Sequence, residues 1–226
     1  HGAESDTPEE ETPAYAPQTI KIVLVVFGLS GMAALAYEVL WSRILVFLLG
    51  SSIYSFSMIL VVYLLGLTAG SFFFARYVDA LKKPLHVFGW IEIFIGLTVL
   101  AGLLLFQRLP FTPYSLKSAP FAYIARNFFS TAVVVLAPTL LMGAAFPLVV
   151  RIYLRSLRSI GRQTGTGYAV NTVGAIIGSF LAGFVMIPLI GSKNSMLLLI
   201  ALSLCCGVIM LALSVREEKT GPANYA

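Results

Sequence analysis

Long runs of apolar residues, separated by short polar segments, extend along the chain from about residue 20 to residue 214. Each run can cross about 30 Å of hydrocarbon, which needs roughly 20 residues in an α-helix. The runs are continuous and do not alternate with polar residues, so they predict helices and not the strands of a membrane barrel. The predicted helices cover residues 20–48, 52–76, 86–107, 122–150, 164–190 and 194–214.

Two of these helices should be irregular. The first is longer than a straight crossing needs, so we expect it to tilt, to break near residues 28–31, or to end near Glu38 and continue along the interface. The fourth contains Pro138 and Pro147, each of which removes a backbone donor and should kink the helix.

Composition agrees with a membrane protein. Hydrophobic residues make up 58% of the 226 residues, charged residues only 11%, and the mean hydropathy is +0.91. A soluble domain carries about a quarter charged residues. We therefore predict an all-α membrane protein with six transmembrane helices in residues 19–215. Residues 1–18 form an acidic, proline-containing tail or linker, and residues 216–226 a short cytoplasmic tail.

The sequence G-x-x-x-G-S-F occurs twice, at residues 66–72 in the second predicted helix and at residues 174–180 in the fifth. This spacing places two glycines on one helix face, where a neighbouring backbone can approach closely in lipid. With six helices, the second and fifth occupy equivalent places in two three-helix units of opposite topology. The motif therefore predicts two inverted repeats. Its structural residues are Gly66, Gly70, Gly174 and Gly178.

Basic residues are unequally divided between the two ends of such a bundle. One end receives ten of them, namely Lys21, Arg76, Lys82, Lys83, Arg151, Arg155, Arg158, Arg162, Arg216 and Lys219. The other end receives five, namely Arg43, Arg108, Lys117, Arg126 and Lys193. The richer end is usually cytoplasmic, so we expect both termini inside the cell and the chain in the cell (inner) membrane. The basic loop 151–162 either anchors this topology or contacts anionic lipid or a soluble partner.

Two acidic residues lie within the apolar runs. Glu38 follows Tyr37 in the first helix, and Glu92 lies near the start of the third. An ionisable group in hydrocarbon is expensive unless it is paired or faces a polar cavity. Arg43 follows Glu38 by five residues, a poor spacing for a salt bridge within one helix. The charge of Glu38 is therefore compensated by a residue of another helix, by a cationic ligand or by a proton. Glu92 also fits an interfacial position beside Trp90.

Two further polar groups fit structural or binding roles. Arg76 and Asp79 are three residues apart at the end of the second helix, so we expect them to pair. Together with Arg43, they are predicted to hold a conformation or act in gating. Asn171 lies in the fifth helix, where its amide should face a neighbouring helix. With Tyr37, Glu38 and Glu92, it is a candidate for substrate binding.

The sequence contains no pattern of a catalytic or metal site. Cys205 and Cys206 are adjacent in an apolar helix and fit no zinc spacing, and His86 has no second ligand nearby. We therefore predict no catalytic residue, no metal, no cofactor and no nucleic-acid partner for this chain. Membrane lipid is the expected surrounding.

Four segments in order carry a resemblance to a known family. They are residues 31–43, residues 50–57 leading to 66–79, residues 138–147, and residues 167–175 with 178–179. They resemble the membrane domain of integral-membrane spermidine-synthase-like proteins, and the six-helix layout resembles half of a major-facilitator transporter. The resemblance implies a soluble aminopropyltransferase-like domain or partner, which binds decarboxylated S-adenosylmethionine and a polyamine. No catalytic residue of that family can be carried over to this sequence.

Three functions follow as hypotheses. The first is a membrane module that anchors, or passes a cationic or amphiphilic substrate to, an aminopropyltransferase-like catalytic partner. The second is a non-catalytic structural subunit of a larger membrane complex, a redox complex included. The third is a half-transporter that works as a homodimer. The sequence does not identify the substrate, the partner subunits or the oligomeric state.

Overall fold

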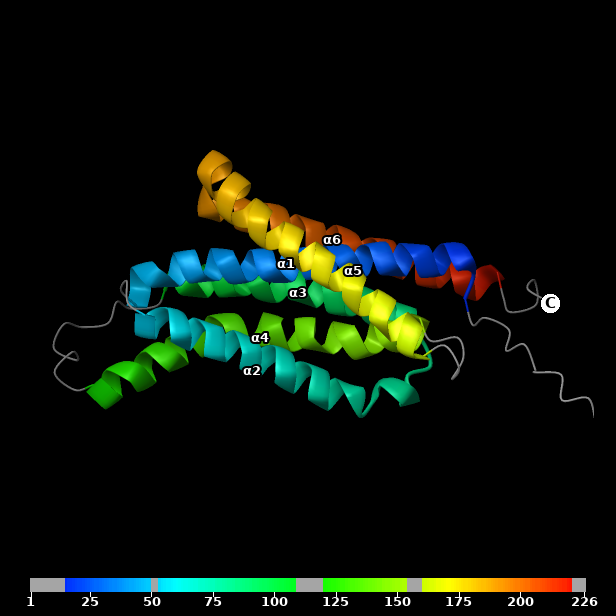
Figure 1. Ribbon diagram of the computed structural model, residues 1–226, viewed down its shortest axis with the longest axis horizontal. Coiled ribbons are helices and arrows are strands. Elements are labelled where there is room, and N and C mark those ends of the chain that lie inside the picture. Colours follow the sequence, from blue (N-terminus) through cyan, green and yellow to red (C-terminus); the bar gives the residue numbers. More distant parts are fainter. Residues whose placement is uncertain (1–14, 50–52, 109–119, 154–159, 221–226) are drawn as a thin grey trace, which may run out of the picture.

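The computed structural model describes residues 15–49, 53–108, 120–153 and 160–220, and within them all regular structure is helical (Figure 1). The α-helices are α1 (Pro17–Leu49), α2 (Ile53–Ala75), α3 (Pro84–Phe106), α4 (Pro120–Tyr153), α5 (Ile160–Phe180) and α6 (Ile187–Thr220). A 3-10 turn, η1 (Val78–Ala80), follows α2, and a π-helical segment, η4 (Leu181–Met186), joins α5 to α6. Most of the acidic tail, Lys117, residues 154–159 of the basic loop and residues 221–226 lie outside the described residues.

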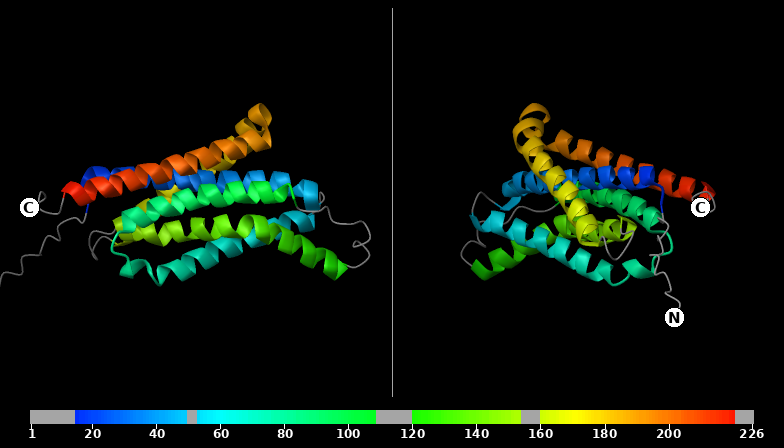
Figure 2. Two further views of the ribbon diagram at one scale, coloured as in Figure 1. Left: turned by 180° about the vertical axis from the view of Figure 1, so that it is seen from behind. Right: turned by 45° about the vertical axis from the view of Figure 1, so that its right-hand side comes forward.

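The helices are long and apolar enough for a membrane protein. Five stretches of the described chain meet the requirements for a span, and the fifth covers 56 residues, Thr164–Lys219. This fifth stretch covers most of α5 and nearly all of α6. Near the start of α6, Gly191 leaves the helical conformation with φ 76° and ψ 162°, and the chain turns back on itself in this region (Figures 1 and 2).

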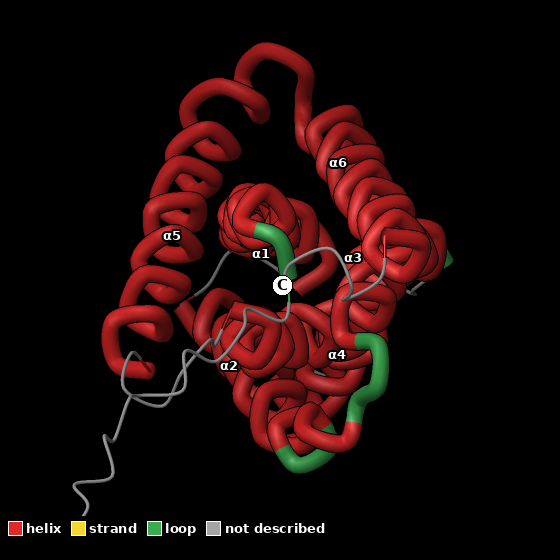
Figure 3. The backbone as a smooth tube through the Cα atoms, turned by 90° about the vertical axis from the view of Figure 1, so that its right-hand side faces the viewer, coloured by secondary structure: helices red, strands yellow, loops and turns green. Residues whose placement is uncertain are grey.

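The first helix is the centre of the bundle. Figure 3 shows α1 between α5 on one side and α6 on the other, with α2 and α4 beneath them. α1 is a single helix from Pro17 to Leu49, so the predicted break near residues 28–31 and the predicted end near Glu38 are both wrong. The reason is packing, because the glycines in this region receive α5 and do not bend the chain.

Each G-x-x-x-G-S-F segment packs closely against one partner helix. α2 packs mainly on α4, and α5 packs mainly on α1. A Cβ atom on Gly70 would overlap the carbonyl group of Leu140, and a Cβ atom on Gly178 would overlap that of Met32. Only glycine allows backbones to approach this closely, as the motif predicts.

The third close pair is α3 with α6, and α3 also packs on α4. Pro138 lies inside α4 and cannot donate to the carbonyl oxygen of Val134, one turn earlier. That oxygen faces Gly102 of α3, where a Cβ atom would lie only 2.8 Å from it. α4 remains one helix, and its first part is set at an angle to the rest, as expected for a helix with internal prolines (Figure 1).

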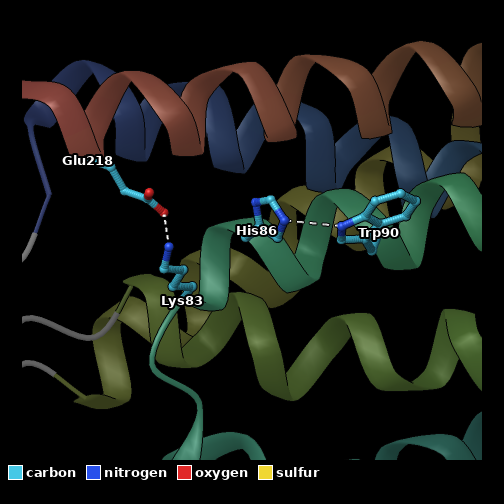
Figure 4. Close-up of polar contacts among 4 residues, drawn as sticks. All are labelled: Lys83, His86, Trp90 and Glu218. Atoms are coloured by element: carbon cyan, nitrogen blue, oxygen red, sulfur yellow. Dashed lines mark hydrogen bonds and ion pairs between the residues drawn. The ribbon is translucent and has the colours of Figure 1, made fainter.

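Ionic contacts join the helices at the end where α1, α3 and α5 begin. Lys83 forms an ion pair of 2.9 Å with Glu218 at the end of α6 (Figure 4). Asp79 of η1 pairs with Arg151 of α4 at 2.8 Å. Thr19 of α1 donates a hydrogen bond to Glu217 of α6.

The predicted pair between Arg76 and Asp79 is wrong. α2 ends at Ala75, so the two residues do not lie on one helical face, and η1 directs Asp79 towards α4. The Arg76 guanidinium instead lies over the Phe72 ring, 4.7 Å from its centroid, where a cation–π contact stabilises it.

Candidate membrane-embedded carboxyl sites

Glu92 lies in the interior of the bundle. Its exposed fraction is 1%, although α3 begins only eight residues earlier, at Pro84. The Ser30 hydroxyl of α1 is a hydrogen-bonding neighbour of its carboxyl group. The Oε1 atom has no hydrogen-bond partner among the described residues, and neither of the ion pairs found there includes Glu92.

Polar side chains from three helices meet around this carboxyl group. The Tyr37 hydroxyl lies 3.4 Å from Ser203 Oγ, and both residues are buried. Tyr37 and Cys206 each interact electrostatically with Glu92. We call Ser30, Tyr37, Glu92, Ser203 and Cys206 the buried polar cluster.

Helical spacing explains how the cluster forms. Ser30 and Tyr37 are seven residues apart on α1, and Ser203 and Cys206 are three apart on α6, so each pair shares one helix face. The two pairs meet where Tyr37 lies 3.4 Å from Ser203, and Glu92 of α3 interacts with Tyr37 and Cys206 beside this contact. The cluster is therefore built from the α1–α3–α6 side of the bundle.

Glu38 lies on a different side of α1. Consecutive helical residues are about 100° apart, so Glu38 and its neighbour Tyr37 point in different directions. It is half-buried and interacts with Tyr63 of α2. The Tyr63 hydroxyl donates a 2.6 Å hydrogen bond to the carbonyl of Ala34, which fixes α2 against α1 at this level. Glu38 takes part in neither of the described ion pairs, and Arg43 is exposed.

A cleft opens on the side of the bundle between α2, α4 and α5. Its volume is about 490 Å³, and its lining includes Ser71, Phe146 and Thr164 together with the ion-paired Asp79 and Arg151. It lies towards the end of the bundle that carries this ion pair.

Aromatic rings connect this cleft with α1 and α5. The Phe146 ring lies 6.1 Å from that of Phe27 in α1 and 6.3 Å from that of Tyr168 in α5, measured between centroids. The region therefore combines aromatic faces with polar groups, which suits an amphiphilic molecule.

The structure brings together some of the residues that the sequence singled out and separates others. Tyr37 and Glu92 belong to one cluster, whereas Glu38 faces α2. Asn171 does face a neighbouring helix, because its side chain packs on Gly31 of α1. It lies at the α1–α5 contact and not in the cluster.

The sequence patterns did not single out Ser30 and Ser203, and they gave Cys206 no role in a site. The only sequence signal for them was their helical spacing within apolar runs, which is common in buried helices. No group of three or more His, Cys, Asp or Glu side chains that could hold a metal ion occurs in the described part of the chain. His86 accepts a 3.1 Å hydrogen bond from the Trp90 indole at the start of α3, a contact within one helix (Figure 4).

No protein-family model, no curated protein and no solved structure matches the chain.

Proposed function

We propose that the chain is a membrane module that holds a cationic, amphiphilic molecule of the polyamine class and presents it to an aminopropyltransferase-like catalytic partner. The partner is either a further domain or a separate subunit. The proposal starts from the resemblance of four segments to spermidine-synthase-like membrane domains. One structural observation carries it further, namely the half-buried carboxyl group of Glu38 without a basic partner among the described residues.

The surroundings of Glu38 support a cation as its partner. A carboxylate at membrane depth needs a compensating charge, and the described residues supply none. Tyr63 interacts with Glu38 but is itself buried, so the ligand would meet the Glu38 carboxyl group and not this ring. Because Glu38 is half-buried and Glu92 is 1% exposed, a molecule of polyamine size would meet Glu38 and not Glu92.

The cleft between α2, α4 and α5 supports an entry route on the same side of the bundle. Phe146 lines this cleft and also touches α1 through Phe27. The Asp79 carboxylate at its rim is 86% exposed and would attract a cation from solution, even though it pairs with Arg151. The rings of Phe146 and Phe27 would contact the methylene chain of the ligand on its way to Glu38.

We further propose that the six helices form two inverted three-helix repeats, as in half of a major-facilitator transporter. An axis that exchanges α1 with α4, α2 with α5 and α3 with α6 would turn the α2–α4 contact into the α5–α1 contact. These are the two most extensive helix contacts, and a G-x-x-x-G-S-F segment makes each of them. The same exchange leaves the α3–α6 pair unchanged, and that pair is the third most extensive.

Ligand binding by single variants tests the proposed function. Purified protein in lipid nanodiscs would be titrated with spermidine, using calorimetry. Loss of one charge-assisted contact costs about 1.5–3 kcal/mol, so we expect Glu38→Gln to weaken binding at least tenfold.

Glu218→Gln serves as the matched control, because it removes a carboxylate that is paired with Lys83 outside this region. The control should bind spermidine as the wild type does. Equal affinities of wild type and Glu38→Gln would overturn the proposal, as would an equal loss in the control.

A further inference from the structure

The buried polar cluster contains a carboxyl group that the proposed function does not use. Glu92 is almost completely buried, and its Oε1 atom lacks a hydrogen-bond partner among the described residues. A bare carboxylate in such a place costs several kcal/mol. Something must therefore neutralise it, and the two simplest candidates are a metal cation and a proton.

The composition of the cluster favours the proton. Hard metal cations such as Ca²⁺ take about six to eight oxygen ligands. Besides the carboxyl group, the cluster offers three hydroxyl groups, from Ser30, Tyr37 and Ser203, together with the weakly ligating thiol of Cys206. A proton needs only one carboxyl oxygen, and the resulting O–H can donate to a hydroxyl such as that of Ser30.

We infer that Glu92 is a membrane-buried proton-binding site, in which the neutral acid is held between hydroxyl groups of α1 and α6. The titratable groups that face it are Tyr37 from α1 and Cys206 from α6, both of which are neutral when protonated. No charged side chain from α4, which also packs on α3, acts on the carboxyl group within the described residues. Glu92 therefore binds and releases its proton without a fixed counter-ion.

This site is separate from the one proposed at Glu38. The two carboxyl groups lie on different sides of α1, one facing α3 and α6 and the other facing α2. The inference therefore does not rest on polyamine binding. An experiment can contradict one of the two proposals and leave the other standing.

Labelling with a hydrophobic carbodiimide tests the inference. The reagent needs the protonated acid, because the acid proton moves to a carbodiimide nitrogen while a carboxyl oxygen bonds to the central carbon. We expect mass spectrometry to find a stable adduct on Glu92 in the nanodisc-embedded protein, with a yield that falls as the pH rises. Glu92→Gln should lose this adduct, and Glu38→Gln should keep it.

Infrared spectroscopy gives a second measurement that does not depend on access of the reagent. The wild type at neutral pH should show a protonated-carboxyl C=O band that shifts in D₂O and is absent from Glu92→Gln. Absence of this band from the folded wild type would overturn the inference. Protection of Glu92 from the carbodiimide by sodium or calcium at constant pH would also overturn it, because the site would then bind a metal cation.

Discussion

Glu38 and Glu92 look alike in the sequence but differ in their surroundings. Each interrupts an apolar run, which is visible without a structure and made both of them candidates. Their neighbours depend on which helix faces meet, and no single run contains that information. Ser203 and Cys206 of α6 come near Glu92 only because α6 packs beside α1 and α3.

The Arg76–Asp79 prediction failed for a local reason. Their spacing of three is meaningful only within a helix, and α2 ends one residue before Arg76. Helix ends are the least certain part of a hydropathy pattern, because the apolar run stops before or after the last hydrogen-bonded turn. Asp79 pairs with a residue 72 positions away, a contact that the sequence could not have indicated.

A double-mutant cycle tests the partner of Asp79. We expect Asp79→Asn and Arg151→Gln to be coupled in thermal stability, by less than about 1 kcal/mol, because the Asp79 side chain is 86% exposed. The matched cycle with Arg76→Gln should show no coupling. Coupling to Arg76 in place of Arg151 would contradict the described geometry.

At the scale of helices, hydropathy predicted the elements well. The six predicted ranges correspond to α1 to α6, and the predicted end of the fifth helix at residue 190 coincides with the reversal at Gly191. The continuity of α1 was not predictable in the same way. Glycines that weaken an isolated helix are harmless where a neighbouring helix fills the space beside them.

The close contacts of α2 and α5 predict a matched pair of effects. Gly70→Ala and Gly178→Ala would each drive a methyl group into a backbone carbonyl, so we expect each to destabilise the protein by about 1–3 kcal/mol. Gly165→Ala in α5 meets nothing within 4 Å and should be neutral or slightly stabilising. Thermal unfolding in detergent measures all three variants, and unchanged stability of Gly70→Ala and Gly178→Ala would refute the close packing.

The reversal at Gly191, near the start of α6, predicts a purely backbone effect. A Cβ atom has open space at both Gly191 and Gly183, but only Gly191 has a positive φ, of 76°. With ψ at 162°, this is a conformation that only glycine adopts readily. We expect Gly191→Ala to cost about 1–3 kcal/mol. Gly183→Ala should cost less than Gly191→Ala, and equal thermal shifts for the two would show that the reversal needs no glycine.

At the scale of the whole molecule, basic residues gather at one end of the bundle. The starts of α1, α3 and α5 and the ends of α2, α4 and α6 lie together there (Figures 1 and 2). The described basic residues at this end are Lys21, Arg76, Lys82, Lys83, Arg151, Arg162, Arg216 and Lys219. The positive-inside tendency then predicts that this end faces the cytoplasm.

Cysteine labelling in intact cells tests this orientation. In a background without Cys205 and Cys206, single cysteines would replace the exposed residues Lys82 and Lys219 at one end and Arg108 and Lys193 at the other. A membrane-impermeant maleimide should label positions 108 and 193 from outside, and positions 82 and 219 only after lysis. The reverse pattern would invert the predicted orientation.

The central claim is that this module serves a catalytic partner, and the intact assembly tests it most directly. The protein would be isolated in mild detergent from the membrane in which it naturally occurs, and its complex weighed by native mass spectrometry. We predict an attached aminopropyltransferase-like domain or subunit of methyltransferase-like fold. A monodisperse assembly of this membrane domain alone, or one with redox subunits only, would contradict the claim.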